Sequence, residues 1–335
     1  MHDWLLDTWY GPAGRGRWLA PLAWLFGAAA GLRRAAYARG WLRRYRSSRP
    51  VVVVGNLTAG GTGKTPLVAW LARRLAARGL RVGVALRGYG GAVRGARRVG
   101  PREYAAAAGD EAVMLARRPG AAVAVGARRS AAVRLLEADC DLILCDDGLQ
   151  HYALARDVEI AVVDGGRGLG NGRLLPAGPL REPAARLDRV DAVVVNGEGY
   201  ARPGALRMQL EPVAVVSLDG HERRALADFA GREVVAAAAI GNPGRFFDLL
   251  RRHGLRLEEI ALPDHAALAA AALPARRGRP LLMTEKDAVK CTGDDWPDAW
   301  YVAIEARVQE PGATELVDRI ASLTAARPQG IVTRD

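Results

Sequence analysis

The residues with the clearest chemistry lie in one glycine-rich stretch between positions 51 and 66. Four valines predict a short buried strand, a run of glycines predicts a loop, and Pro66 opens a helix. In this order the elements form a P-loop, in which backbone N–H groups and a helix N-terminus surround a phosphate. Lys64 is expected to reach the β- and γ-phosphates, and the Thr65 hydroxyl to bind Mg²⁺. The predicted nucleotide-binding residues are Thr58, Ala59, Gly60, Gly61, Thr62, Gly63, Lys64 and Thr65.

One residue departs from the strict G-x-x-x-x-G-K-[ST] pattern. Thr58 stands where the first glycine would be, and Gly60 and Gly61 supply the flexibility instead. An ordinary glycine-rich turn between a strand and a helix is the alternative. The flanking strand and helix favour the P-loop.

A second signal is the apolar run 142–145, which ends in the carboxylates Asp146 and Asp147. In P-loop proteins a carboxylate at such a strand end orients Mg²⁺, directly or through water, beside the loop threonine. Two carboxylates followed by Gln150 are more than a strand end needs. We predict that Thr65, Asp146, Asp147 and Gln150 form a magnesium site, and leave open which aspartate is nearer the metal.

Arginines in two loops are candidates for substrate binding. Arg87 and Tyr89 follow the expected strand 81–86 in a glycine-rich turn, where they could face the phosphate site or form a plain surface turn. The irregular segment 164–183 is rich in glycine and proline, and a long segment of this kind is often a binding loop. Within it, Arg173 and Arg181 could each contact phosphate.

Two aspartates stand where a helix is expected to begin. Asp110 is consistent with a simple N-cap or with a functional carboxylate, and Asp264 could be another N-cap. His265 and His151 stand beside acidic or glutamine-containing motifs, but a lone histidine is more often structural than catalytic. Of the 48 basic residues only Lys64, Lys286 and Lys290 are lysine, which marks segment 284–290 as a possible functional segment or a chance pair.

The order of the elements predicts an α/β fold. Expected strands at 51–54, 81–86, 121–125, 141–145, 158–163 and 191–195 alternate with helices and are apolar on both faces. This pattern is typical of a mostly parallel sheet covered by helices, with ligands at the carboxyl ends of the strands. Strands near 212–217, 234–240 and 281–284 suggest a second, smaller α/β half. The predicted domains are 1–48, an N-terminal membrane-associated helical segment; 49–200, the P-loop domain; and 201–335, the smaller α/β domain.

The N-terminal segment indicates a membrane surface. Residues 18–32 are apolar and flanked by arginines, but a helix of this length spans about 22 Å, short of a bilayer core of roughly 30 Å. An interfacial anchor, a marginal span and a core helix remain open, and the nearby tryptophans favour the interface. The net charge of +12 points to an anionic partner. Three cysteines without metal-ligand spacing fit a reducing compartment.

Taken together, these motifs resemble the tetraacyldisaccharide 4′-kinase family, the lipid A 4′-kinases of Gram-negative bacteria. The resemblance covers residues 1 to about 290 and rests on motifs in family order. These are residues 54–66, 87–90, 109–111, 146–151, 171–183, 263–265 and 284–290, of which block 171–183 is the most specific.

The resemblance implies an enzyme at the cytoplasmic face of the inner membrane that uses ATP and Mg²⁺. It implies transfer of the γ-phosphate to the 4′-hydroxyl of an acylated glucosamine disaccharide 1-phosphate, with no nucleic acid partner. The family's carboxylate–histidine base maps onto Asp110 and His265. Ala112 and Ala266 depart from the family pattern, which leaves the positioning of His265 less certain.

A P-loop switch ATPase that binds nucleic acid or a protein partner is the alternative. Such switches often carry a lysine before the paired glycines, where this chain has Ala59. A soluble nucleic-acid binder would also leave the apolar N-terminal stretch without a purpose.

Overall fold

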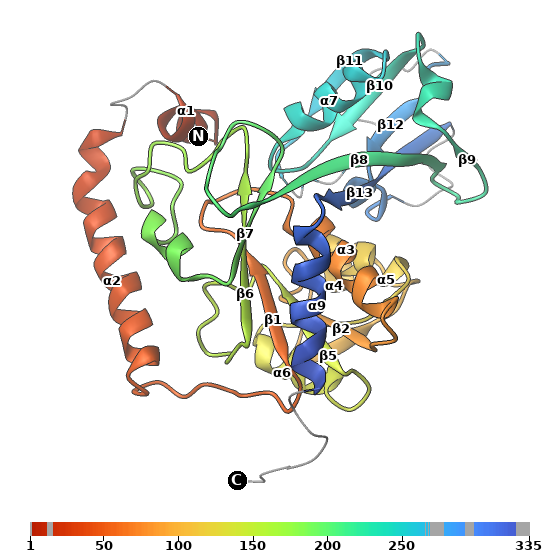
Figure 1. Ribbon diagram of the computed structural model, residues 1–335. Coiled ribbons are helices and arrows are strands. Elements are labelled where there is room, and N and C mark those ends of the chain that lie inside the picture. Colours follow the sequence, from red (N-terminus) through yellow and green to blue (C-terminus); the bar gives the residue numbers. More distant parts are fainter. Residues whose placement is uncertain are drawn as a thin grey trace.

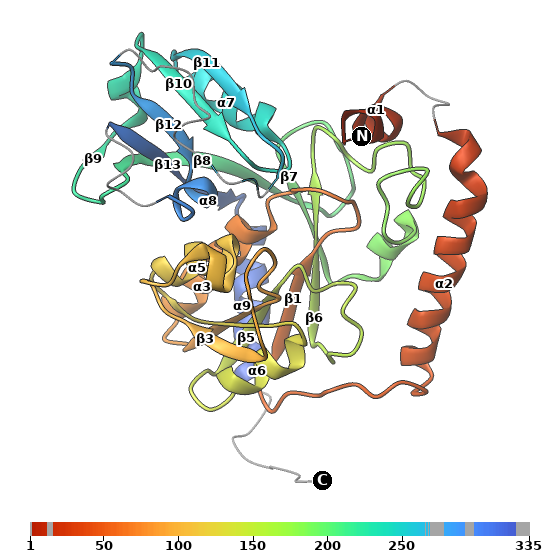
Figure 2. The same ribbon diagram turned by 180° about the vertical axis from the view of Figure 1, so that it is seen from behind.

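The computed structural model describes residues 2–11, 16–264, 266, 268, 278–291 and 298–325. In this part of the chain thirteen strands form one sheet, with helices packed on both of its faces (Figure 1 and, from behind, Figure 2). The helices are α1 His2–Tyr10, α2 Ala20–Ala38, α3 Lys64–Ala76, α4 Ala105–Ala108, α5 Asp110–Arg117, α6 Arg129–Leu136, α7 Pro243–Arg252, α8 Glu285–Ala288 and α9 Gly312–Ala325. The strands are β1 Val51–Gly55, β2 Val82–Leu86, β3 Ala96–Val99, β4 Ala121–Gly126, β5 Leu142–Asp146, β6 Val158–Asp164, β7 Ala192–Asn196, β8 Leu206–Ser217, β9 Arg223–Arg224, β10 Glu233–Ala238, β11 Arg256–Ala261, β12 Leu281–Thr284 and β13 Ala299–Val308.

The sheet is mostly parallel, as predicted. Its strand order is β11-β10-β12-β13-β8-β7-β6-β1-β5-β2-β4-β3, with β9 paired to β8. Strand β1 pairs in parallel with β5 and β6, so their carboxyl ends meet at one edge of the sheet. The antiparallel pairs are β8 with β13, β8 with β9, and β3 with β4.

Strand β1 shows why the sheet is covered on both faces. Val52 and Val54 pack into one apolar cluster with α3 and α9, while Val51 and Val53 pack into another with α6. Successive side chains of a strand point to opposite faces, so a run of valines is stable only where both faces are buried. The six predicted strands of the first half are confirmed, each to within one residue at either end.

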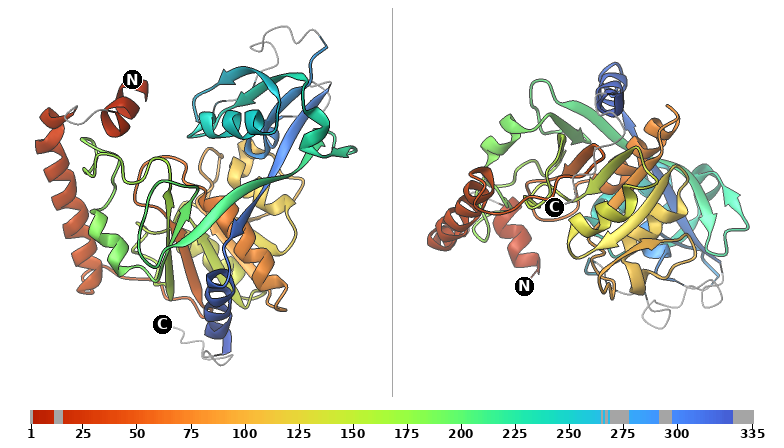
Figure 3. Two further views of the ribbon diagram at one scale, coloured as in Figure 1. Left: turned by 45° about the horizontal axis from the view of Figure 1, so that its top comes forward. Right: turned by 90° about the horizontal axis from the view of Figure 1, so that it is seen from below.

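The long strands β8 and β13 join the P-loop half to the second half (Figure 3). After β13 the chain returns to the first half, where α9 packs against α3 and shares its apolar cluster. The predicted second-half strands occur, but the strand expected at 212–217 begins at Leu206. The domain bounds 1–48, 49–200 and 201–335 stay a prediction.

Helix α2 lies at the outer side of the molecule, along the loops that follow β6 (Figures 1 and 3). Ala23 is the residue of α2 that is buried, whereas Trp24 and Leu25 are 76% and 68% exposed. A core helix is therefore excluded. Among the residues that the structure describes, no helix is both long and apolar enough to traverse a bilayer.

Candidate functional site

The P-loop lies at the carboxyl end of β1, near the middle of the sheet. Helix α3 begins at Lys64, and its N-cap Gly63 has φ 94°, a left-handed conformation that glycine adopts without strain. A Cβ atom at Gly63 would also lie 2.4 Å from Nδ2 of Asn196, which donates a hydrogen bond of 3.0 Å to the Thr62 carbonyl. The loop is thus held from β7 as well as from its own strand.

The Asn56 side chain holds the P-loop in shape through hydrogen bonds to its backbone, including that of Thr58, which stands where the strict pattern has a glycine. Its buried Nδ2 donates to the carbonyls of Thr58 at 2.8 Å and Gly60 at 3.2 Å. The residues around Thr58 also pair with the later loop, because Ala59 N donates to the Pro179 carbonyl at 2.8 Å. An extended backbone at Thr58 therefore replaces the flexible glycine of the strict pattern.

Thr65 and Asp146 meet where the predicted magnesium site should be. The Thr65 hydroxyl donates to Oδ2 of Asp146 at 2.7 Å, and Asp146 is 1% exposed. Burial, and next the charge of Glu111, raise the pKa of Asp146 to about 7. Its Oδ1 is buried and accepts no hydrogen bond from the described residues. A cation beside Oδ1 would satisfy this oxygen, so the residues present fit Mg²⁺.

Asp147 and Gln150 take different positions beside the P-loop. Asp147 Oδ1 lies 3.5 Å from Lys64 Nζ, and although burial opposes ionisation, Lys64 and then Arg181 lower the pKa of Asp147 to about 2. Gln150 Nε2 donates to the Asn56 carbonyl at 3.1 Å and to Glu182 at 2.9 Å, and its assignment as a metal ligand stays a prediction. In the described residues no cluster of three or more His, Cys, Asp or Glu could hold a metal.

The lysine-containing segment predicted at 284–290 lies beside the acidic start of α5. Lys290 Nζ lies 3.9 Å from Oδ2 of Asp110. Lys286 Nζ lies 3.6 Å from Glu111 and 3.2 Å from Asp264. Burial opposes the charge of Lys286, but Glu111 and Asp264 outweigh it and raise the pKa of this lysine. His265 lies outside the described residues.

A cavity of about 1240 Å³ joins these groups. It is lined by the P-loop from Gly60 to Thr65, by the carboxyl ends of the strands and by residues of the second half. Asp110 is buried just behind its wall, between lining residues Gly109 and Glu111. Of the predicted residues, Arg87, Tyr89, Asp146, Asp147, Gln150 and Arg181 line it, whereas Arg173 does not, and its assignment to the substrate stays a prediction.

Three residues of the site were not predicted individually from the sequence. Arg129 at the start of α6 lines the cavity and donates to the Asp146 carbonyl. Arg33 of α2 also lines it. Glu182, buried in the loop after β6, binds Gln150. In an arginine-rich chain single arginines do not stand out, but Glu182 belongs to a block singled out for other reasons.

His151 is a poor candidate for the base. It lines the cavity, but burial, and then Arg129 and Arg156, lower its pKa to about 4. It is therefore neutral near neutral pH and a weak proton acceptor.

Comparisons with known proteins agree on one family. The family described as "Tetraacyldisaccharide-1-P 4'-kinase" matches residues 15–322. A tetraacyldisaccharide 4′-kinase of Pseudomonas aeruginosa is 49% identical over 311 residues, which is 90% of this chain and 92% of that protein. One of Aeromonas salmonicida is 48% identical over 332 residues, 96% of this chain and 98% of that protein.

A solved structure matches as well. It is the crystal structure of LpxK from Aquifex aeolicus in complex with ATP, which is 28% identical with a TM-score of 0.77 and covers 91% of this chain and 99% of that one. The sequence and structural matches span the P-loop, the carboxylates and the second half together. This chain belongs to the tetraacyldisaccharide-1-phosphate 4′-kinase family.

Proposed function

We propose that this protein is a phosphotransferase that moves the γ-phosphate of ATP onto the 4′-hydroxyl of tetraacyldisaccharide 1-phosphate, giving lipid IVA. The names of its relatives state the kinase activity and its substrate class. The observation that carries the proposal is a single cavity lined both by the P-loop and by Glu111 and Lys286 next to Asp110. Donor and acceptor groups thereby face one space, as phosphoryl transfer requires.

The P-loop half binds the donor. Its backbone N–H groups surround the phosphates, and Lys64 neutralises their charge. Thr65 and Asp146 would hold Mg²⁺, which when bound would offset negative charge on the phosphates. Lys64 is already directed to this place by Asn56 Oδ1 at 3.2 Å and by Asp147.

The α5–α8 side binds and activates the acceptor. Asp110 takes the proton of the attacking hydroxyl, and His265 is its partner, as in the carboxylate–histidine pair that the family resemblance implies. Lys290 places a positive charge 3.9 Å from the Asp110 carboxylate. Arg87, Tyr89 and Arg181 line the cavity, and we expect them to bind the phosphorylated sugar.

The apolar N-terminus brings the enzyme to its lipid at the cytoplasmic face of the inner membrane. Trp18, Trp24, Leu25 and Leu32 are exposed on and beside α2. An arginine-rich segment follows them, which anionic lipid would attract. The arrangement favours an interfacial anchor over a soluble nucleic-acid binder, because it accounts for both the apolar and the basic residues.

The direct test is to incubate the purified full chain with γ-labelled ATP, Mg²⁺ and the disaccharide lipid. A phosphorylated lipid is expected. Absence of product together with ATPase activity stimulated by DNA would contradict the proposal and favour a switch ATPase.

Membrane association has its own test. Trp24→Ser with Leu25→Ser removes two exposed apolar side chains and should shift the protein from sedimenting with phospholipid vesicles to the supernatant. Tyr104→Ser, which removes an equally exposed ring near α4, should leave sedimentation unchanged. If the two variants sedimented with the vesicles to the same extent, the proposed role of α2 in membrane binding would be contradicted.

A further inference from the structure

The loop between Asn171 and Glu182 is attached to the N-terminal helices on one side. Trp9 Nε1 of α1 donates to the Pro176 carbonyl at 3.0 Å. Ala23 of α2 packs with Ala177 of the loop in a small apolar cluster. The position of this loop therefore depends on where α1 and α2 lie.

On its other side the same loop holds the P-loop. Ala59 N donates to the Pro179 carbonyl, and Arg181 N donates to the Leu57 carbonyl at 2.7 Å. The residue that follows, Glu182, is 5% exposed and gathers side chains from both sides.

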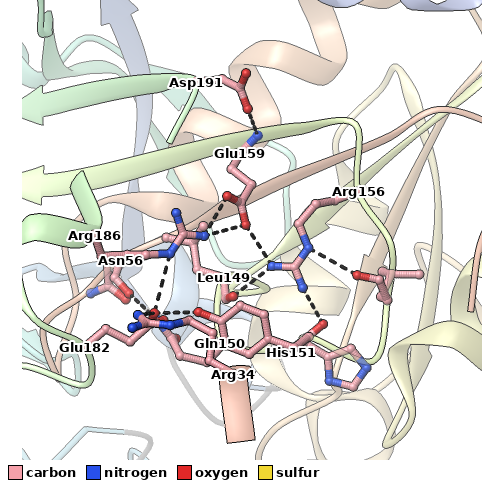
Figure 4. Close-up of polar contacts among 12 residues, drawn as sticks. Arg34, Asn56, Leu149, Gln150, His151, Arg156, Glu159, Glu182, Arg186 and Asp191 are labelled. Carbon is pink, nitrogen blue, oxygen red and sulfur yellow. Dashed lines mark hydrogen bonds and ion pairs between the residues drawn. The ribbon is translucent and has the colours of Figure 1, made fainter. Parts of the chain in front are cut away.

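Glu182 connects α2 to the site through side chains (Figure 4). Its Oε2 lies 3.5 Å from Arg34 of α2 and 3.5 Å from Arg186, and accepts a hydrogen bond of 2.5 Å from the Tyr152 hydroxyl. Its Oε1 accepts from Gln150 at 2.9 Å. The buried Glu182 carboxylate thus forms an ion pair with Arg34 of α2 and a hydrogen bond with the side-chain amide of Gln150.

The contacts continue from Gln150 to the phosphate-binding lysine. Gln150 Nε2 donates to the Asn56 carbonyl at 3.1 Å, and Asn56 Oδ1 accepts from Lys64 Nζ at 3.2 Å. An unbroken series of polar contacts therefore runs from Arg34 to Lys64. Asn56 is the residue that sets the shape of the P-loop, so a shift of its backbone would move both the loop and the lysine.

The two arginines on Glu182 differ in how firmly they are held. Arg186 is buried and also binds Glu159 at 2.6 Å, so it stays in place independently of α2. The Arg34 side chain is 34% exposed, and its helix has few buried residues. The Arg34 contact is therefore the one that changes when α2 moves.

We propose that Glu182 is a positioning residue that couples the seating of α2 to the shape of the P-loop, so that ATP binds more tightly when Arg34 is docked. This proposal depends on the proposed function in one respect only, namely that α2 contacts a lipid surface. Coupling between two sites is reciprocal, and the lower end of its usual range is about fivefold. We expect the loss of Arg34 to weaken ATP binding by about this factor.

The test measures the Kd of a non-hydrolysable fluorescent ATP analogue for the full chain on phospholipid vesicles, so no acceptor lipid or catalysis is involved. Arg34→Gln should raise the Kd about fivefold. Arg43→Gln, which removes the same charge from an exposed position of the same basic segment, should not. A failed kinase assay would leave this result unaffected.

A double-mutant cycle separates coupling from general damage. Glu182→Gln should raise the Kd at least as much as Arg34→Gln, and the double variant should bind the analogue no more weakly than Glu182→Gln alone. Additive effects, or an unchanged Kd in Arg34→Gln, would overturn the proposal.

Discussion

Replacement of Asn56 by alanine tests whether the P-loop is preshaped by one side chain. Asn56 is fully buried, and its amide donates to the carbonyls of Thr58 and Gly60. Alanine removes both bonds and the acceptor for Lys64, while Asp147 still lies 3.5 Å from the lysine. The loop can then adopt shapes in which its N–H groups no longer converge on a phosphate.

The size of the effect follows from the two bonds to the loop. A neutral hydrogen bond contributes about 1 kcal/mol net, so the loss is about 2 kcal/mol. If this free energy serves only to preorganise the loop, ATP binding weakens about 30-fold, since each 1.4 kcal/mol is tenfold. Asn56→Asp keeps an acceptor for Lys64 but cannot donate, so it should weaken binding at least as much.

Binding of a fluorescent ATP analogue and the KM for ATP measure this effect, and thermal unfolding checks that the variant is folded. The KM for the lipid acceptor should stay unchanged, because Asn56 does not line the cavity. A folded Asn56→Ala protein whose affinity for ATP lies within threefold of that of the unsubstituted enzyme would refute the reasoning.

Three further predictions, two of them with a paired variant for comparison, test the rest of the site. Asp110→Asn should lower kcat for lipid phosphorylation by about 10²- to 10⁴-fold with unchanged ATP binding. Glu111→Gln should lower kcat by a smaller factor. A larger loss of kcat in Glu111→Gln than in Asp110→Asn would make Glu111 the base. Thr65→Val should raise the Mg²⁺ concentration needed for half-maximal activity about tenfold, and an unchanged magnesium titration would remove Thr65 from the metal site. Gly241→Ala places a Cβ atom 2.8 Å from a P-loop nitrogen. It should raise the KM for ATP about fivefold, which corresponds to about 1 kcal/mol. Gly244→Ala has room for its Cβ atom and should leave the KM for ATP unchanged.

The donor half of the site could be predicted because its residues are consecutive or lie at strand ends. A buried strand, a glycine loop and Lys64-Thr65 define their own geometry, and a carboxylate at the end of another strand is typical beside such a loop. Asp146 was therefore expected near Thr65. In the structure β5 is the parallel neighbour of β1, and the side chains of Asp146 and Thr65 are hydrogen-bonded. Gln150 shows the limit of this reasoning, since the hydrogen bond from its Nε2 to Glu182 joins two motifs whose contact the sequence does not reveal. Its assignment as a metal ligand stays a prediction.

Strands β3, β11 and β13 were not predicted, for a physical reason. Strand β3 (Ala96–Val99) is an antiparallel edge strand with two arginines, and β11 (Arg256–Ala261) is the opposite edge, with three charged residues and none that is buried. Edge strands need little apolar surface, so their sequences resemble loops. Strand β13 (Ala299–Val308) is only partly buried in its ribbon with β8, and its pairing depends on contacts far along the chain.

The acceptor half could be marked from the sequence but not assembled. The rarity of lysine pointed to residues 284–290, and only the packing of α8 beside α5 shows that Lys290 lies against Asp110 and Lys286 against Glu111. The two halves also meet on the donor side, where Gly241 closely approaches the P-loop nitrogen of Gly61. One interface between the halves therefore positions both reactants. A substitution that separates the halves should impair ATP binding and acceptor activation together, whereas a change within either motif should impair only one.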